Sequence, residues 1–76
     1  MKTAQTIVTV LTSVYGVSEI EADAITVEWA AARLAETVGA DKAAKAWKRL
    51  NAKRYRLGRH TTIPAWGTPL HAAYFA

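Results

Sequence analysis

The amino-acid sequence predicts a small, mainly α-helical protein, and three observations carry that prediction. Apolar residues recur at steps of three and four along two stretches upstream of residue 40. A third stretch, residues 41–55, separates an apolar face from a stripe of lysines and arginines when it is drawn as a helix. Glycines follow the first two stretches, at positions where helices commonly end. We therefore expect a single three-helix domain over residues 1–76, with a helical body over 1–60.

Composition limits the class of protein. A chain of 76 residues buries only a small core. It contains no cysteine, which excludes disulfides and thiolate metal sites and suits a reducing, cytoplasmic setting. No apolar run approaches the roughly 18 residues that a membrane-spanning helix requires, so no membrane is expected as a partner.

The first helix is expected over residues 3–15. Its apolar residues are spaced as on one face of a helix: Ala4, Ile7, Val8, Leu11, Val14 and Tyr15. Residues 6–12 are rich in β-branched side chains and would also tolerate a strand. Helix is favoured because Gly16 supplies a C-terminal stop. This helix is also the expected surface for self-association if the protein is a homodimer.

The second helix is expected to begin at Glu19 and to end at Gly39. Ser18 and Glu21 have the spacing of a capping box. A seam of apolar residues follows at steps of four and three: Ile20, Ala24, Val27, Ala31, Leu34 and Val38. Thr26 could cap a helix as well, so a break at that point, giving a short helix and a longer one, stays open.

The third helix, residues 41–55, is the basic one, with Asp41 as its expected N-cap. Ala43, Ala46, Trp47 and Leu50 form its expected core face, and Lys42, Lys45, Arg49 and Lys53 form the stripe beside it. Only Gly39 and Ala40 separate it from the second helix, so we expect a sharp crossing with the outline of a helix-turn-helix.

Charge is divided between the two halves of the chain. Residues 1–41 hold all six acids and two bases, a net charge of −4, whereas residues 42–76 hold eight bases and no acid, a net charge of +8. Such a segregated positive half is typical of a surface that meets a polyanion. The interpretations kept open are a nucleic acid, an acidic protein surface and a merely solvated helix face; a lipid surface is the weaker option because the face beside the lysines is mainly alanine.

The segment after the basic helix divides into a candidate wing and a tail. Residues 55–64 have a central glycine between β-tolerant residues, so a short β wing is left open. Residues 61–76 carry no formal charge, and their prolines and glycine exclude a long helix. Four large apolar side chains there, Trp66, Leu70, Tyr74 and Phe75, either cover the core or insert into a partner. The simplest interpretation of Trp66 is an anchor that holds the tail to its own domain.

Two segments carry a resemblance to a known family. Residues 25–34, ITVEWAAARL, resemble the opening helix of small winged helix-turn-helix DNA-binding proteins of the phage excisionase and MerR type, and residues 58–64, GRHTTIP, resemble their wing strand. The resemblance implies a DNA-binding regulator or recombination accessory protein of a phage or mobile element.

No combination of residues indicates catalysis. His60 and His71 are the only histidines, and they lie on separate stretches without a cysteine, so no metal site is expected. No glycine-rich phosphate loop and no serine with a matching base is evident. We predict a non-enzyme without a cofactor.

The sequence thus favours duplex DNA as the partner, bound by the basic helix and the arginines after it. The predicted contact residues are Lys42, Lys45, Lys48, Arg49, Lys53, Arg54, Arg56 and Arg59. The alternative is a small phage-type inhibitor or adaptor that binds an acidic host protein. That partner would meet the same basic face and the aromatic residues of the tail, Trp66, Tyr74 and Phe75.

Overall fold

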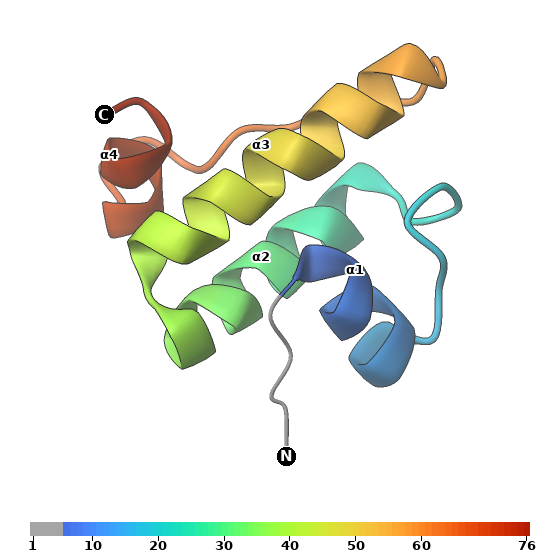
Figure 1. Ribbon diagram of the computed structural model, residues 1–76, viewed down its shortest axis with the longest axis horizontal. Coiled ribbons are helices and arrows are strands. Elements are labelled where there is room, and N and C mark those ends of the chain that lie inside the picture. Colours follow the sequence, from blue (N-terminus) through green and yellow to red (C-terminus); the bar gives the residue numbers. More distant parts are fainter. Residues whose placement is uncertain (1–5) are drawn as a thin grey trace.

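The computed structural model describes residues 6–76, which form helices joined by a tight turn at Gly39 and by two longer irregular segments, residues 16–23 and 57–68 (Figure 1). A short helix, α1 (Ile7–Val10), continues into a π-helical turn, η1 (Leu11–Tyr15), and is followed by α2 (Ala24–Val38), α3 (Ala40–Arg56) and α4 (Pro69–Tyr74). This part of the chain contains no strand, and none of its helices has the length and apolar character needed to cross a membrane. The prediction of a mainly α-helical protein is confirmed.

The first predicted helix is present over residues 7–15, while residues 3–5 lie outside the described part. Thr6 caps it, because its Oγ1 accepts a hydrogen bond from the Thr9 amide at 3.1 Å. Gly16, with φ of +68°, ends it as predicted. Three of its residues, Ile7, Val10 and Leu11, are buried in the core. One face of the first helix therefore belongs to the core, whereas Thr9, Thr12, Ser13 and Val14 are exposed, and self-association through this helix stays a prediction.

The second helix begins later than predicted. The Glu21 amide does donate to the Ser18 Oγ, which is one of the two bonds of a capping box, and the Ser18 hydroxyl donates to the Glu21 Oε1, but these bonds close a turn at residues 19–21. The cap of α2 is Asp23, whose Oδ1 accepts from the Thr26 amide at 3.1 Å. The predicted start at Glu19 is wrong because the chain folds a separate turn before Asp23 supplies the cap.

Gly39 alone separates α2 from α3. It ends α2 as predicted, with its amide donating to the Ala35 carbonyl at 2.9 Å, and its own carbonyl accepts from the Ala43 amide of α3 at 3.1 Å. Asp41 is thus not the N-cap; it lies in the first turn of α3, where a carboxylate still favours the helix dipole. The two helices run side by side in opposite directions rather than crossing sharply (Figure 1).

The core lies where α1, η1, α2 and α3 meet. From α3 it takes Ala43, Trp47 and Leu50, which confirms most of the predicted core face, while Ala46 is half-buried. The facing residues of α2 are Val27, Ala30, Ala31 and Leu34. Alanines at these positions let the helix backbones approach, so that one tryptophan can fill much of the remaining space.

Residues 55–64 do not form a wing. The Gly58 amide donates to the Tyr55 carbonyl at 3.1 Å and the Arg59 amide donates to the Arg54 carbonyl at 2.8 Å, the bond pattern of a Schellman motif. Gly58 has φ of +73°, as that motif requires. The glycine that suggested a hairpin is instead the residue that ends α3, and the chain continues to residue 65 without regular structure.

The tail packs on the core through α4. Leu70 and Tyr74 contact the core cluster, and the Tyr74 ring meets Trp47 edge-on with ring centroids 6.2 Å apart. Asn51 of α3 ties the tail down, because its Nδ2 donates to the Thr62 carbonyl at 2.7 Å and to the Tyr74 hydroxyl at 2.9 Å. Trp66 is not the anchor that we expected: it is 87% exposed.

Candidate nucleic-acid interface

Five cationic side chains follow one line along α3. The buried face of α3 packs on the core, so the opposite face of the helix points to solvent. Basic residues recur at steps of three and four along that solvent-facing side. We call this line the α3 stripe; it consists of Lys42, Lys45, Arg49, Lys53 and Arg56, all exposed. Because a helix rises about 1.5 Å per residue, the stripe is about 21 Å long.

One acidic side chain touches the α3 stripe. The Lys53 Nζ lies 3.0 Å from the Glu19 Oε1, the only salt bridge within residues 6–76. The Lys53 side chain is 49% exposed, and an ion pair in such a position contributes at most about 1 kcal/mol. Glu19 therefore positions Lys53 without removing it from contact with a stronger anion.

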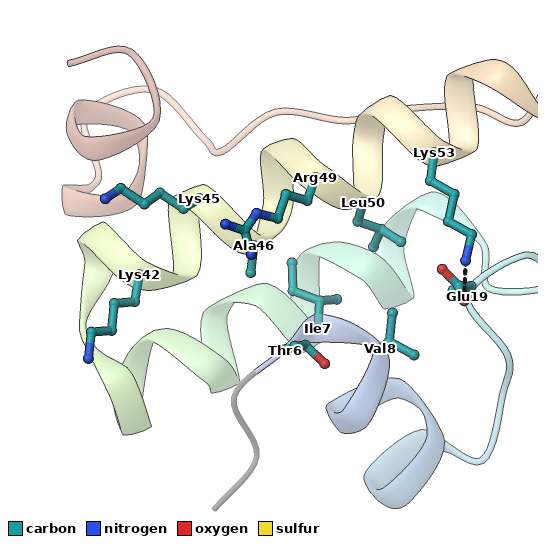
Figure 2. Close-up of a pocket in the computed structure, with 10 residues that line it drawn as sticks. All are labelled: Thr6, Ile7, Val8, Glu19, Lys42, Lys45, Ala46, Arg49, Leu50 and Lys53. Carbon is teal, nitrogen blue, oxygen red and sulfur yellow. Dashed lines mark hydrogen bonds and ion pairs between the residues drawn. The ribbon is translucent and has the colours of Figure 1, made fainter.

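A groove of about 410 Å³ lies beside the stripe, between α1 and α3 (Figure 2). We call it the α1–α3 groove. Its apolar surface comes from Ile7 and Val8 of α1 and from Ala46 and Leu50 of α3. Four stripe residues line it as well: Lys42, Lys45, Arg49 and Lys53. The groove thus combines an apolar floor with a cationic rim.

Arg54 does not belong to the exposed surface. It is only 3% exposed; its Nε donates to the His60 carbonyl at 3.0 Å and its Nη1 donates to the Glu19 carbonyl at 2.6 Å. Burial lowers the pKa of this guanidinium, and the nearby Arg59 charge lowers it further. The predicted role of Arg54 in partner contact is wrong, because its guanidinium is buried and donates to the main-chain carbonyls of His60 and Glu19.

Lys48 and Arg59 are exposed but lie off the stripe. Lys48 projects from the flank of α3 near α4, with its Nζ 5.3 Å from the centroid of the Tyr74 ring. Arg59 follows the glycine that ends α3. The sequence grouped all eight basic residues as one site, whereas the fold divides them into a stripe of five, two flanking cations and one buried guanidinium.

The sequence predicted Arg56 as a contact residue but did not place it on the stripe, and it missed Glu19. Arg56 joins the stripe because α3 extends one residue beyond the expected end, and the three-residue step from Lys53 already indicated that alignment. Glu19 reaches Lys53 from 34 residues away, which no local pattern could reveal. Tyr74, proposed as a partner contact, is held by Asn51 and Trp47, so only Trp66 and Phe75 of the three aromatic candidates remain largely exposed.

The segments that carry the family resemblance lie in α2 and after α3. Residues 25–34 fall within α2, and residues 58–64 begin with the glycine that ends α3. The resemblance to winged helix-turn-helix proteins stays a prediction. Comparison with protein-family models, curated proteins and solved structures found no match to this chain.

Proposed function

We propose that this protein binds duplex DNA through the α3 stripe, with its five cations lying along phosphate groups. The observation that carries the proposal is the exposed line of Lys42, Lys45, Arg49, Lys53 and Arg56 on one rigid helix. A line of about 21 Å matches about six base pairs, because each strand of duplex DNA carries one phosphate about every 3.4 Å along the axis.

The binding energy would come mainly from release of counterions condensed on the DNA. A small domain that contacts only the backbone binds at roughly 10⁻⁴ to 10⁻⁶ M at physiological salt, without sequence preference. The resemblance of residues 25–34 and 58–64 to phage excisionase and MerR-type proteins supports a role as a regulator or recombination accessory protein.

A salt titration of labelled duplex DNA tests the proposal. Each phosphate contact contributes about 0.9 to the slope of log affinity against log salt. A variant with Lys45→Gln and Arg49→Gln should therefore lower that slope by about 2. Lys48→Gln is the matched control, because it removes one charge from the same helix but off the stripe. We expect the slope of this variant to fall by less than the roughly 0.9 that the loss of one phosphate contact gives.

Two results would contradict DNA binding by the stripe. One is no detectable binding at about 50 mM salt, where electrostatic binding is strong. The other is a double variant that keeps the slope of the parent while its circular dichroism shows an intact fold.

The second candidate is an inhibitor or adaptor that binds an acidic host protein, and the apolar floor of the α1–α3 groove favours it. Phosphate contacts need no apolar floor, whereas an acidic amphipathic helix would place apolar side chains there and carboxylates on the cationic rim. Ala46→Gln fills the floor without changing charge. It should abolish binding of an acidic amphipathic peptide and leave DNA binding unchanged; if the peptide binds equally well to the variant, the groove is not its site.

A further inference from the structure

A second groove lies on a different part of the molecule, between the outer face of α2 and residues 64–70. We call it the α2–tail groove; its volume is about 590 Å³. Trp29 and Ala32 line it from α2, and Pro64 and Leu70 line it from the tail. No residue lines both this groove and the α1–α3 groove, so an occupant here would leave the α3 stripe free.

The lining of this groove describes the chemistry of its occupant. Most of the lining is apolar, and its charged residues are two carboxylates, Glu28 and Glu36, with no lysine or arginine. A phosphate or a carboxylate ligand is therefore disfavoured. An aromatic body that carries a hydrogen-bond donor, such as an indole, suits apolar walls with acceptors at their edge.

Trp66 is such a group, and it stands next to the groove without entering it. Its neighbours Ala65 and Thr68 line the groove, whereas Trp66 itself is 87% exposed and rests edge-on against His71, with ring centroids 4.9 Å apart. The turn that carries it is well defined: the Thr68 hydroxyl donates to the Ala65 carbonyl at 2.7 Å and Gly67 has φ of +84°. The indole is thus presented to solvent on an ordered turn.

We propose that two copies of this chain associate with two-fold symmetry and that each inserts Trp66 into the α2–tail groove of the other. The inserting side chain and the receiving groove belong to the same surface, so one rotation brings both pairs together. Trp29, 53% exposed at the groove, would pack against the entering indole. Tryptophan is also the residue most enriched at the energetic centres of interfaces.

The area available indicates a reversible dimer. Each inserted indole buries roughly 150–250 Å², and with the matching walls of both grooves the two insertions bury roughly 600–1,000 Å² in total. Specific, stable interfaces begin at about 1,200 Å², and the two insertions lie below that size. We therefore expect association that depends on concentration.

The dimer would hold two α3 stripes in one particle, which raises DNA affinity through bivalency. That consequence rests on the proposed DNA binding; the association itself does not. The dependence on salt distinguishes dimer formation from DNA binding. Added salt does not weaken an apolar interface with like-charged rims, whereas it weakens contacts to phosphate groups.

The experiment is sedimentation velocity of the full chain without DNA, from micromolar to millimolar concentration, at low and high salt. Trp66→Ala removes the inserting side chain, and Ala32→Gln narrows the groove while leaving Trp66 in place; both positions are exposed, so neither change should unfold the protein. Tyr55→Ala is the matched control, because it removes a 76% exposed aromatic residue that lines neither groove.

We expect a monomer–dimer equilibrium that both groove variants abolish, that the control retains and that high salt does not weaken. The proposal is overturned if the protein stays monomeric at millimolar concentration, or if a dimer persists in both Trp66→Ala and Ala32→Gln. Association that high salt disrupts or that extends beyond dimers would equally reject it, because such behaviour indicates an open, charge-driven contact instead.

Discussion

The charged guanidinium of Arg54 is buried and donates hydrogen bonds to main-chain carbonyls. Its guanidinium connects α3 to the loop at His60 and to the turn at Glu19, two segments that are distant in sequence. Burial and the Arg59 charge lower its pKa, while Asp23 opposes that shift. The group remains charged because an arginine does not lose its proton in a protein. This arginine therefore serves the fold, although it stands within a run of residues that meet solvent.

Replacement of Arg54 should separate stability from binding. Hydrogen bonds that involve a charged group contribute about 1.5–3 kcal/mol each, so Arg54→Ala should lower the free energy of unfolding by at least about 2 kcal/mol. Arg49→Ala, an exposed arginine on the same helix, should change it by no more than about 0.5 kcal/mol. Urea denaturation measures both; equal stability of the two variants would show that the buried contacts are not important.

The stability of the N-terminus of α2 depends on pH through its cap, Asp23. The Thr26 hydroxyl and then the Thr26 amide stabilise the carboxylate and lower the pKa of Asp23. A lowered folded-state pKa means that the stabilisation is fully present above the ordinary aspartate value of about 3.9 and is lost as pH falls through the folded value.

We expect Asp23→Asn to keep the cap but to reduce the dependence of Tm on pH below about 4, where the carboxylate of the parent titrates. Asp23→Ala should lower Tm at neutral pH as well, because it removes the acceptor. Thermal unfolding across a pH series measures both effects. A Tm–pH curve for Asp23→Asn that superimposes on the parent curve would show that this carboxylate contributes nothing to acid stability.

At the scale of elements, α3 has two separate tasks. One side supplies Ala43, Trp47 and Leu50 to the core, and the other carries the α3 stripe. The helix has to end sharply, because residues 59–65 must return along the molecule so that Thr62 can reach Asn51. Gly58 makes that ending with a positive φ.

Gly58→Ala tests this ending. A Cβ at this position would meet no atom within 4 Å, so the cost is one of backbone conformation alone. Left-handed conformation costs an L-residue about 1–2 kcal/mol, and we expect the free energy of unfolding to fall by about 1 kcal/mol. Gly58→Asn should lose less, because asparagine tolerates this conformation better. Chemical denaturation distinguishes them; an alanine variant as stable as the parent would mean that the turn relaxes to another conformation.

At the scale of the whole molecule, the tail completes a core that three helices leave open. Leu70 and Tyr74 pack against the core cluster, the Tyr74 ring meets Trp47, and Asn51 donates a hydrogen bond to the Tyr74 hydroxyl. The described body measures 32 × 27 × 17 Å, so few side chains lie far from its surface. Loss of one covering element therefore exposes a large share of the core and lowers the stability of the whole protein.

Deletion of residues 65–76 should unfold the protein or abolish its cooperative melting, because Trp47 would lose its cover. Trp66→Ala, which changes only an exposed side chain of the same segment, should leave the Tm of the monomer at dilute concentration unchanged. Thermal melts followed by circular dichroism measure the difference. A truncated chain that melts as cooperatively as the parent would show that the tail is not part of the core.

Periodicity and glycine positions were enough to predict α3, its core face and the stops at Gly16 and Gly39. They failed where two local signals competed: Ser18 and Asp23 each accept a hydrogen bond from the amide three residues on, and the helix follows the second of them. The helix α4 was missed although Thr68 and Pro69 supply an N-cap and a first-turn proline. A wing over residues 55–64 was left open because glycine adopts a positive φ in a hairpin turn and at a helix end equally well.

The sequence by itself determined the helical class, the amphipathic character of α3 and the separation of acidic from basic residues, because these depend on the order of side chains along one helix or one half of the chain. The tertiary structure decided which basic residues are exposed, since Arg54 is buried and bonded to carbonyls of distant segments, whereas Lys53 stays exposed although it pairs with Glu19. It also decided that Tyr74 packs against the core while Trp66 is exposed to solvent. Those outcomes depend on contacts between residues far apart in sequence, which local periodicity does not encode.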